Sequence, residues 1–242
     1  MTTVTAVTIK NRFEQNLKCK LIGKAGQSKL SRASILIVGA GGTGCPVFTY
    51  LYFAGVGDLT IIDHDRVSES NLNRQFLYAP FDLDKYKALV VESRFRENPT
   101  QKVKGLPYKF SDFVKDKKYI IHNYDLVIDC TDNIKTKLEI EKFCKKKSLP
   151  YIMCGVHGYL INMFCYHPVY SNAHYSDVYN CRVIEEEQLE KSEGTFPMTT
   201  GILGTMVANE AFKMIIGQHK NVIYNTGFNY NILHPNLYKL EL

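Results

Sequence analysis

A glycine-rich segment near the amino terminus constrains the fold more than any other feature of the sequence. It runs from Gly39 to Gly44 as Gly-Ala-Gly-Gly-Thr-Gly, between the apolar residues 34–38 and the mainly apolar residues 47–53. The first apolar run predicts a buried strand, and the second predicts a helix that ends at Gly55. Glycines in such a turn let the backbone approach a phosphate, and the helix presents its positive end to the same anion. The segment therefore predicts a β-α-β nucleotide-binding unit.

One acidic and two basic residues after this turn indicate which nucleotide binds there. A second strand is predicted over residues 58–63, and it ends in Asp63, 19 residues after Gly44, where an acid is expected to bind ribose hydroxyls. This much fits NAD as well as ATP. Arg74 and Lys87 come next. Because a triphosphate carries more negative charge and its transfer requires cations beside the reacting phosphorus, the two basic residues favour ATP.

Strands and helices alternate along the rest of the chain. Further strands are predicted over residues 124–130, 151–155 and 160–166, and helices over residues 14–30, 85–97 and around 140–144. This alternation predicts an α/β fold of the Rossmann type, with a doubly wound, mainly parallel sheet and helices on both faces. No low-complexity linker interrupts the sequence, so we expect residues 1–242 to form a single domain.

Two segments of the C-terminal half break the alternation. Residues 167–196 are polar and rich in tyrosine, which predicts a long loop that is either functional or disordered. Residues 199–217 predict a helix that is apolar almost all round, with Gly201, Gly204 and Ala208 allowing close packing. Such a helix lies deep in the core or in a subunit interface, and we expect a homodimer.

Taken together, the motifs resemble those of the ThiF/MoeB/HesA adenylyltransferases, which are relatives of the ubiquitin-activating enzymes. The resemblance extends over about residues 12–217. The segments that carry it, in the order and spacing of the family, are Gly39–Cys45, Gly55–Gly57, Ile61–Asp65, Ser70–Gln75, Lys87 and Asp129–Asn133.

The resemblance implies a role for each matching residue. The nucleotide site that it implies consists of Gly39, Gly41, Gly42, Gly44, Asp63, Asp65, Asn71, Arg74, Gln75 and Lys87. In the family, the residue matching Asp63 binds the ribose, and those matching Asn71, Arg74 and Lys87 hold the phosphates. Arg74, Lys87 and Asp132 are then the catalytic residues, and Asp132 handles Mg²⁺. An alternative role for Asp132 is to cap the helix that follows it. The implied reaction joins a carboxylate to the α-phosphate of ATP, giving an acyl-adenylate and pyrophosphate.

The sequence departs from the family pattern at two functional positions. Gln15 stands where the family has an arginine that reaches a neighbouring subunit's nucleotide, and Arg12 or Lys18 would have to replace it. Glu190 stands where some members have a nucleophilic cysteine, and the nearest thiol is Cys181. A loop cysteine is more often inert than nucleophilic, so we expect a non-covalent adenylate as the product.

The sequence also lacks the zinc-binding pattern of many family members, which is two Cys-x-x-Cys pairs. The first pair would fall near Asn172 and Tyr175, and no second pair follows. The nearest set of zinc-ligating residue types matches no familiar zinc spacing and consists of Cys165, His167, His174 and Cys181. We therefore expect ATP and Mg²⁺ as cofactors and no zinc.

Composition narrows the cellular setting. The apolar runs are too short to cross a bilayer, and the amino terminus has no apolar signal-peptide core. Seven irregularly spaced cysteines fit reduced thiols, so we expect a cytoplasmic protein without a membrane partner. The net charge of +6 is moderate, and the basic run of Lys142 and residues 145–147 is interpreted as the end of a helix, which makes a nucleic acid partner unexpected.

The function expected from the sequence is ATP-dependent adenylation of the C-terminal carboxylate of a small ubiquitin-fold or sulfur-carrier protein. Three alternatives stay open: adenylation of a peptide during antibiotic biosynthesis, adenylation of a carboxylate on a tRNA base, and a non-catalytic subunit that pairs with an active partner. NAD-dependent oxidoreduction is disfavoured, because it leaves the two basic residues Arg74 and Lys87 without a function.

Overall fold

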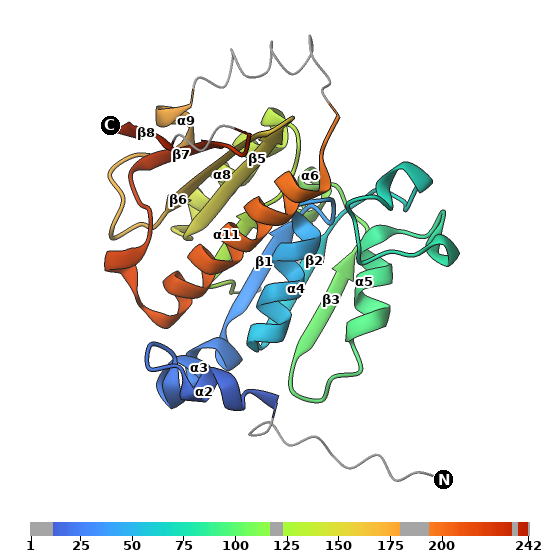
Figure 1. Ribbon diagram of the computed structural model, residues 1–242, viewed down its shortest axis with the longest axis horizontal. Helices are drawn as coiled ribbons and strands as arrows, with labels where there is room; N and C mark the ends of the chain where they lie inside the picture. The colour runs from blue at the N-terminus through green and yellow to red at the C-terminus, as the bar shows by residue number, and fades with distance from the viewer. Residues whose placement is uncertain (1–11, 117–122, 180–193, 234–236, 242) are drawn as a thin grey trace.

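An eight-stranded sheet forms the centre of the molecule, in the strand order β3-β2-β1-β4-β5-β6-β7-β8 (Figure 1). The computed structural model describes residues 12–116, 123–179, 194–233 and 237–241, so Cys181 and Glu190 lie outside the described residues. In chain order the strands are β1 (Ser34–Val38), β2 (Asp58–Ile62), β3 (Lys102–Leu106), β4 (Leu126–Asp129), β5 (Tyr151–His157), β6 (Leu160–Tyr166), β7 (Thr226–Asn231) and β8 (Leu237–Glu241).

The sheet has a parallel half and an antiparallel half. Strands β3, β2, β1, β4 and β5 are parallel neighbours, and β6, β7 and β8 continue the sheet in antiparallel pairing. The prediction of a Rossmann-like, mainly parallel sheet is confirmed. The chain proceeds from β1 toward β3 on one side and from β4 outward on the other. The order therefore reverses between β1 and β4, where open α/β sheets bind ligands at the carboxyl ends of the strands.

Three strands were not expected from the sequence, and each has a composition unlike a buried strand. The outer strand β3 carries two lysines and a glycine among its five residues, which suits an edge rather than the centre of a sheet. Strand β7 is half asparagine and threonine, and β8 has charged residues at two of its five positions. A period of two with few apolar residues is a weak signal in a single sequence.

Helices cover both faces of the sheet, as predicted. They are α2 (Glu14–Lys18), α3 (Gly23–Arg32), α4 (Gly44–Ala54), α5 (Lys87–Phe95), α6 (Phe110–Phe113), α8 (Ile134–Lys147), α9 (Tyr175–Val178) and α11 (Pro197–Ile216), with 3-10 turns η1 (Glu69–Asn71), η2 (Pro80–Asp82) and η3 (His219–Asn221). Strand β1 shows the division: Ile35 and Ile37 belong to the core with α4 and α11, whereas Leu36 and Val38 belong to the core with α6 and α8. Because successive side chains of a strand point to opposite faces, an uninterrupted apolar strand requires both layers.

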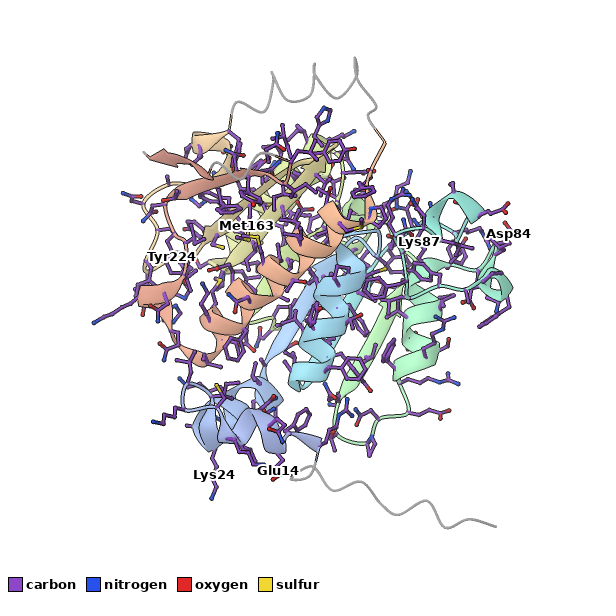
Figure 2. All side chains as sticks on the ribbon, viewed as in Figure 1. Glu14, Lys24, Asp84, Lys87, Met163 and Tyr224 are labelled. Carbon is purple, nitrogen blue, oxygen red and sulfur yellow. The ribbon has the colours of Figure 1, made fainter. Side chains whose placement is uncertain are left out.

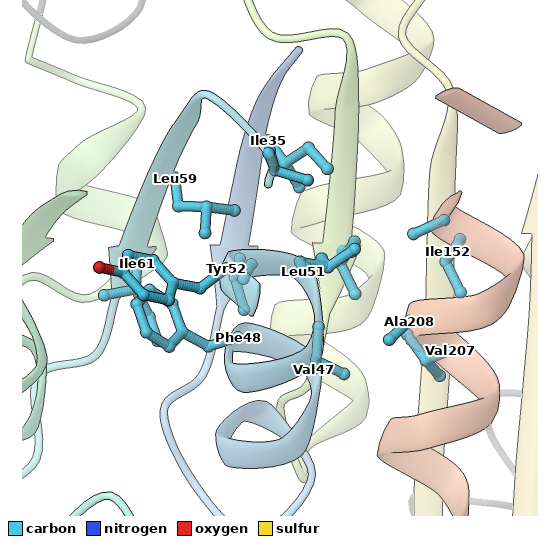
Figure 3. Packing of buried hydrophobic residues seen from close by; sticks show 14 of the residues in the cluster. Ile35, Val47, Phe48, Leu51, Tyr52, Leu59, Ile61, Ile152, Val207 and Ala208 are labelled. Carbon is cyan, nitrogen blue, oxygen red and sulfur yellow. The ribbon is translucent and has the colours of Figure 1, made fainter. Parts of the chain in front are cut away.

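The predicted apolar helix is α11, and it lies against α4 and the sheet (Figure 1). Close to this contact, Val207 and Ala208 lie beside Ile152 of β5 (Figure 3). At Gly204 a Cβ atom would lie only 2.2 Å from Cγ of Pro46, so the close packing predicted there is confirmed. The same prediction was wrong for Gly201, because a Cβ atom there would meet nothing within 4 Å.

The segment before β1 is two helices, not the single helix predicted over residues 14–30. Helix α2 ends at Lys18, and α3 begins at Gly23, whose φ of +53° breaks the regular helix. Asn16 and Gln27 hold the two helices together and to the end of α4: the Asn16 amide donates to Gln27 Oε1 at 2.9 Å, and both amides donate to the carbonyl oxygen of Ala54.

The long loop predicted over residues 167–196 is partly structured. Residues 175–178 form α9, whose Tyr175 is buried in the core below α8. The carboxylate of Glu141 accepts hydrogen bonds from the backbone N–H and the hydroxyl of Ser176, at 2.9 and 2.7 Å. These contacts attach the first part of the loop to α8, whereas residues 180–193 lie outside the described part of the chain.

Two smaller expectations concern charge and membranes. The basic run ends α8, with Lys145, Lys146 and Lys147 in its last turn, so its interpretation as a helix end is confirmed. Within the described ranges, every helix is too short or too polar to cross a bilayer.

Two substitutions in α11 test the packing of this helix. We expect Gly204→Ala to lower the free energy of unfolding by about 1–3 kcal/mol, because the added methyl group meets Pro46 and overpacks the contact. Gly201→Ala, on the same helix in open space, should raise it by about 0.5–1 kcal/mol through helix propensity. Urea denaturation followed by circular dichroism measures both. Equal effects of the two changes would contradict the helix crossing described above.

Candidate functional site

A cleft of about 900 Å³ opens where the carboxyl ends of β1, β2 and β4 meet. It brings together residues that are far apart in the sequence, including most of the predicted site. The predicted residues that line it are Gly39, Gly41, Gly42, Asp63, Asp65, Arg74, Gln75, Lys87 and Asp132. Gly44 and Asn71 belong to the predicted site but do not line the cleft.

The glycine turn forms the floor of the cleft. Gly39 has a φ of +100°, and a Cβ atom there would lie 2.7 Å from the carbonyl oxygen of Cys130, at the end of β4. A Cβ atom on Gly44 would lie 2.0 Å from the carbonyl oxygen of Gly39, so Gly44 closes the turn on itself. Helix α4 begins at Gly44, directly after the cleft-lining residues Gly41, Gly42 and Thr43, so the positive end of the helix lies next to the cleft. This arrangement provides an anion site made of backbone.

Asp63 connects this turn to β2. Its carboxylate accepts the N–H of Ala40 and the N–H of Asp65, each at 2.7 Å. Burial raises the pKa of Asp63, and the nearby charge of Lys87 partly offsets this effect. Each carboxylate oxygen has a second lone pair, which is compatible with accepting a ribose hydroxyl.

Two cations stand beside the glycine turn. Lys87 is only 5% exposed, and its Nζ lies 3.0 Å from Oδ2 of Asp65. Arg74 donates from one guanidinium nitrogen to the carbonyl oxygen of Ser70 and to Oδ1 of Asn73, at 2.9 and 2.8 Å. The Cγ atom of Arg74 lies 3.4 Å from where a Cβ of Gly42 would stand. Both side chains therefore reach the same cleft from the segment after β2.

Gln75 and Asn71 differ in their relation to the cleft. Gln75 is 4% exposed, and its Oε1 atom has no hydrogen-bond partner within the described residues. A buried acceptor without a donor is costly, so an unpaired oxygen in a cleft wall fits a ligand that brings a donor. Asn71 instead ends η1, where its Oδ1 accepts the N–H of Ser68 at 3.3 Å. To contact a phosphate, the Asn71 side chain would have to leave this hydrogen bond and adopt another rotamer.

Asp132 follows β4 on the other side of the glycine turn and is exposed to the cleft. The capping alternative for Asp132 was wrong, because the residue that caps α8 is Asn133, whose Oδ1 accepts the N–H of Thr136 at 2.9 Å. Within the described residues, the one group of acid, histidine or cysteine side chains close enough to share a metal ion is Asp63, His64 and Asp65. Asp132 stands apart from that group.

Comparison with known proteins agrees with this geometry. The model of the ThiF family matches residues 13–242. The chain belongs to the ThiF family. It is 34% identical over 234 residues to the probable molybdopterin-synthase adenylyltransferase of Gracilaria tenuistipitata var. liui, and the match covers 96% of this chain and 64% of that protein. It is 30% identical over 213 residues to the sulfur carrier protein adenylyltransferase of Thermus thermophilus, over 86% of this chain and 78% of that protein.

The fold of this ThiF-family chain also resembles that of solved structures. The structure of Escherichia coli MccB with ATP matches it with a TM-score of 0.80, at 21% sequence identity, and the match covers 96% of this chain and 71% of that chain. At this identity the likeness shows the fold alone. The chain spans 64% of the length of the Gracilaria relative.

One residue of the site was missed by sequence reasoning. Lys137 of α8 is 3% exposed, and it pairs with the fully buried carboxylate of Asp129 at the end of β4. The Lys137 ammonium group also donates hydrogen bonds to the carbonyl oxygens of Thr131 and Cys154, at 2.8 and 2.6 Å. Burial alone would lower the pKa of Lys137, but the charge and hydrogen bond of Asp129, together with Cys154 and Cys130, raise it. The ammonium group thus holds the loop that presents Asp132.

A sequence signal for Lys137 exists in retrospect. It falls at helical spacing with the buried Ile134, Ile140 and Cys144, so a lysine occupies the apolar face of α8. Lysine is almost never fully buried without a partner, and a lysine on an apolar face therefore predicts a buried acid nearby.

The two candidates for the missing arginine are occupied within their own chain. The guanidinium of Arg12 lies over the rings of Phe13 and Tyr52, at 5.4 and 5.0 Å from their centroids. Lys18 pairs with Glu14 at 2.8 Å. The described members of the possible zinc set are also apart: Cys165 is buried in β6, whereas His174 stacks on Tyr166.

Substitution of Lys137 tests the buried ion pair. We expect Lys137→Met to lower the free energy of unfolding by about 3–5 kcal/mol, because it leaves the Asp129 carboxylate buried without a counter-charge. Lys142→Met, an exposed position of the same helix, should change it by less than about 0.5 kcal/mol. Thermal unfolding of the two variants measures the difference. If both variants unfold at the wild-type temperature, Lys137 does not hold the Asp132 loop.

Proposed function

We propose that this ThiF-family chain is an ATP-dependent adenylyltransferase that converts a carboxylate into an acyl-adenylate. The observation that carries the proposal is the meeting of a backbone anion site with two cations, Lys87 and Arg74, in one cleft. A pyrophosphate alone would be held by the glycine turn and the start of α4. The additional cations fit the larger charge of a triphosphate and of its transfer. The adenylyltransferase names of the Gracilaria and Thermus relatives support the same activity.

The proposed reaction needs no nucleophile from the protein. A carboxylate oxygen of the substrate attacks the α-phosphorus of ATP, the bond from that phosphorus to the bridging oxygen breaks, and pyrophosphate leaves with the electron pair. Asp63 would fix the ribose, while Lys87 and Arg74 would neutralise charge that develops on the phosphates. Asp132 would hold a Mg²⁺ ion, which when bound supplies further positive charge to phosphate oxygens. Asn71 and Gln75 would complete the nucleotide contacts.

The end of the cleft beside β5, β6 and β7 favours an extended peptide segment as the substrate that carries the carboxylate. Asn162 of β6 lies in register between Gly155 of β5 and Asn229 of β7, and all three line the cleft. The Asn162 amide lies about 3.0–3.1 Å from where a Cβ of Gly155 would stand, so it covers the bare glycine. Neither asparagine amide makes a hydrogen bond to the described residues. Two amides that each offer a donor and an acceptor match the alternating groups of an extended peptide.

We therefore propose the flexible C-terminal tail of a small ubiquitin-like or sulfur-carrier protein as the substrate. Adenylation of a free peptide uses the same contacts and stays the second candidate. A carboxylate on a tRNA base would leave the side-chain amides of Asn162 and Asn229 without a function. A non-catalytic subunit has no need of Asp63, Lys87, Arg74 and Asp132 in one cleft.

We also propose that the protein acts as a cytoplasmic homodimer of a single domain. Large apolar side chains are exposed on two neighbouring helices: Tyr50 and Phe53 on α4, and Met198 and Ile202 on α11. Exposed apolar surface of this kind is typical of an interface between subunits. Light scattering at micromolar concentration should give twice the mass of one chain, and a monomer would count against the dimer.

Pyrophosphate–ATP exchange tests the proposed reaction. With Mg-ATP and a carrier protein that supports exchange, Lys87→Ala, Arg74→Ala and Asp132→Ala should each lower the exchange rate roughly 100- to 1,000-fold, the usual effect of losing one transition-state contact. Lys85→Ala is the matched control, because the Lys85 side chain is 57% exposed and pairs with Asp82 instead of lining the cleft. Exchange rates near wild type in all three cleft variants would mean that these residues do not act on the phosphates.

The asparagine pair gives a separate test of the substrate. We expect Asn162→Ala and Asn229→Ala each to raise KM for the carrier protein about three- to tenfold, as for the loss of hydrogen bonds to a peptide, with KM for ATP unchanged. Asn209→Ala, an exposed position of α11, serves as the control. A parallel rise of KM for ATP, or no change in either constant, would remove the pair from the substrate path.

A further inference from the structure

A second cavity, of about 330 Å³, lies at the opposite end of the sheet from the nucleotide cleft. It forms where β1 and β4 begin, between the ends of α3 and α11 and the turn η3. Figure 2 shows the separation: Tyr224, which contacts a residue of this cavity, and Lys87 of the nucleotide cleft lie on opposite sides of the molecule. The cavity has no part in the proposed reaction.

Positive charge exceeds negative charge in the cavity wall. Lys29 and Arg32 come from the last turn of α3, and Asp125 is the one acid in the wall. Asp125 uses Oδ2 to accept the N–H of Ser34, at 2.8 Å. Arg32 has no ion-pair partner within the described residues. Lys29 gives one proton to the carbonyl oxygen of Ile216, at 2.7 Å, which fixes its ammonium group and leaves two further donors.

Two histidines complete the wall with a ring nitrogen available on each. His167 uses Nδ1 to accept the N–H of Val169 at 3.1 Å, so its neutral ring carries the proton on Nε2. His219 uses Nδ1 in a hydrogen bond of 3.0 Å with the hydroxyl of Tyr224. The His219 ring also stacks on Tyr170, with centroids 4.3 Å apart, and lies 5.0 Å from the His167 ring. Both rings are therefore held in place.

Burial and neighbouring basic groups both act on the pKa values of these two rings. Burial lowers the pKa of His167, and His219 lowers it further. Burial likewise lowers the pKa of His219, with a contribution from the charge of Lys29. At neutral pH both rings are therefore uncharged, His167 is a donor through its Nε2–H group, and the positive charge of the cavity comes from Lys29 and Arg32. An anion would pair with both cations at once.

We propose that this cavity binds a tetrahedral oxyanion, such as inorganic phosphate or the terminal phosphate of a small metabolite. The donors come from three separate segments: Lys29 and Arg32 from α3, His167 after β6, and His219 from η3. A guanidinium and an ammonium contribute the charge, and the Nε2–H group of His167 adds a neutral donor. The His219 ring adds a second donor when its Nδ1 accepts the proton of the Tyr224 hydroxyl. Arrangements of this kind suit an anion with oxygens in several directions.

Sulfate is a suitable probe, because its charge is constant near neutral pH. Nuclear magnetic resonance of the full chain at pH 7 should show saturable shifts of the His167 and His219 ring signals on titration with sodium sulfate, compared with sodium chloride at equal ionic strength. Because His167 and His219 line this cavity and not the nucleotide cleft, their signals report sulfate binding in the cavity alone. The nucleotide cleft also attracts anions, so this distinction is needed. Arg32→Gln should weaken the affinity measured there about tenfold or more, as for the loss of a charge-assisted hydrogen bond.

A control on the same helix makes the test specific. Lys24→Gln removes an exposed positive charge of α3 outside the cavity, and it should leave the affinity for sulfate unchanged. Because Arg32 makes no contact that the fold depends on, its substitution should not prevent folding. Equal weakening by the two variants, or ring signals that do not respond to sulfate, would overturn the site. Titrations with phosphate and with glycerol phosphate separate the two sources of the anion, since tighter binding of the ester indicates a metabolite.

Discussion

The hydrogen bond from the N–H of Ala40 to the carboxylate of Asp63 is the contact on which the nucleotide site depends. It connects the glycine turn after β1 to the end of β2, so the position of the anion site and the position of the ribose-binding acid are set together. Gly39 allows this by its positive φ and by its approach to Cys130 after β4. The three strand ends are therefore fixed relative to one another before any ligand binds, which is the preorganisation that charge stabilisation requires.

A second polar contact serves the other half of the cleft. The pair of Lys137 and Asp129 lies below the loop after β4, and it connects this loop to β5 through the carbonyl oxygen of Cys154. A buried ion pair gains little net free energy over an apolar substitute, but the loss of one partner is costly. The Lys137–Asp129 pair therefore matters for the geometry of the site, because it fixes the loop that carries Asp132. From β5 the cleft continues to Asn162, which places the proposed acyl path directly beside the proposed phosphate site.

The parts of the site that follow from local rules could be predicted from the sequence. Gly39 and Asp63 were found because a strand, a turn and a helix place them within one unit, whereas Lys87 was found from its positive charge and from the family resemblance. The role of Lys137 depends on which face of α8 meets the sheet, and the pairing of Asn162 with Asn229 joins residues of two strands far apart in the sequence. Such contacts leave no periodic signal. In the same way, spacing in α11 could not tell Gly204 from Gly201, because only the crossing with α4 distinguishes them.

The central claim is that the cleft is a triphosphate site and not a dinucleotide site. Isothermal titration calorimetry of the purified chain with Mg-ATP and with NAD tests this claim directly. Saturable binding of Mg-ATP that is weakened in Lys87→Ala, without measurable binding of NAD, is the predicted result. Tight binding of NAD without binding of Mg-ATP would contradict the account, since Lys87 and Arg74 would then have no phosphate to hold.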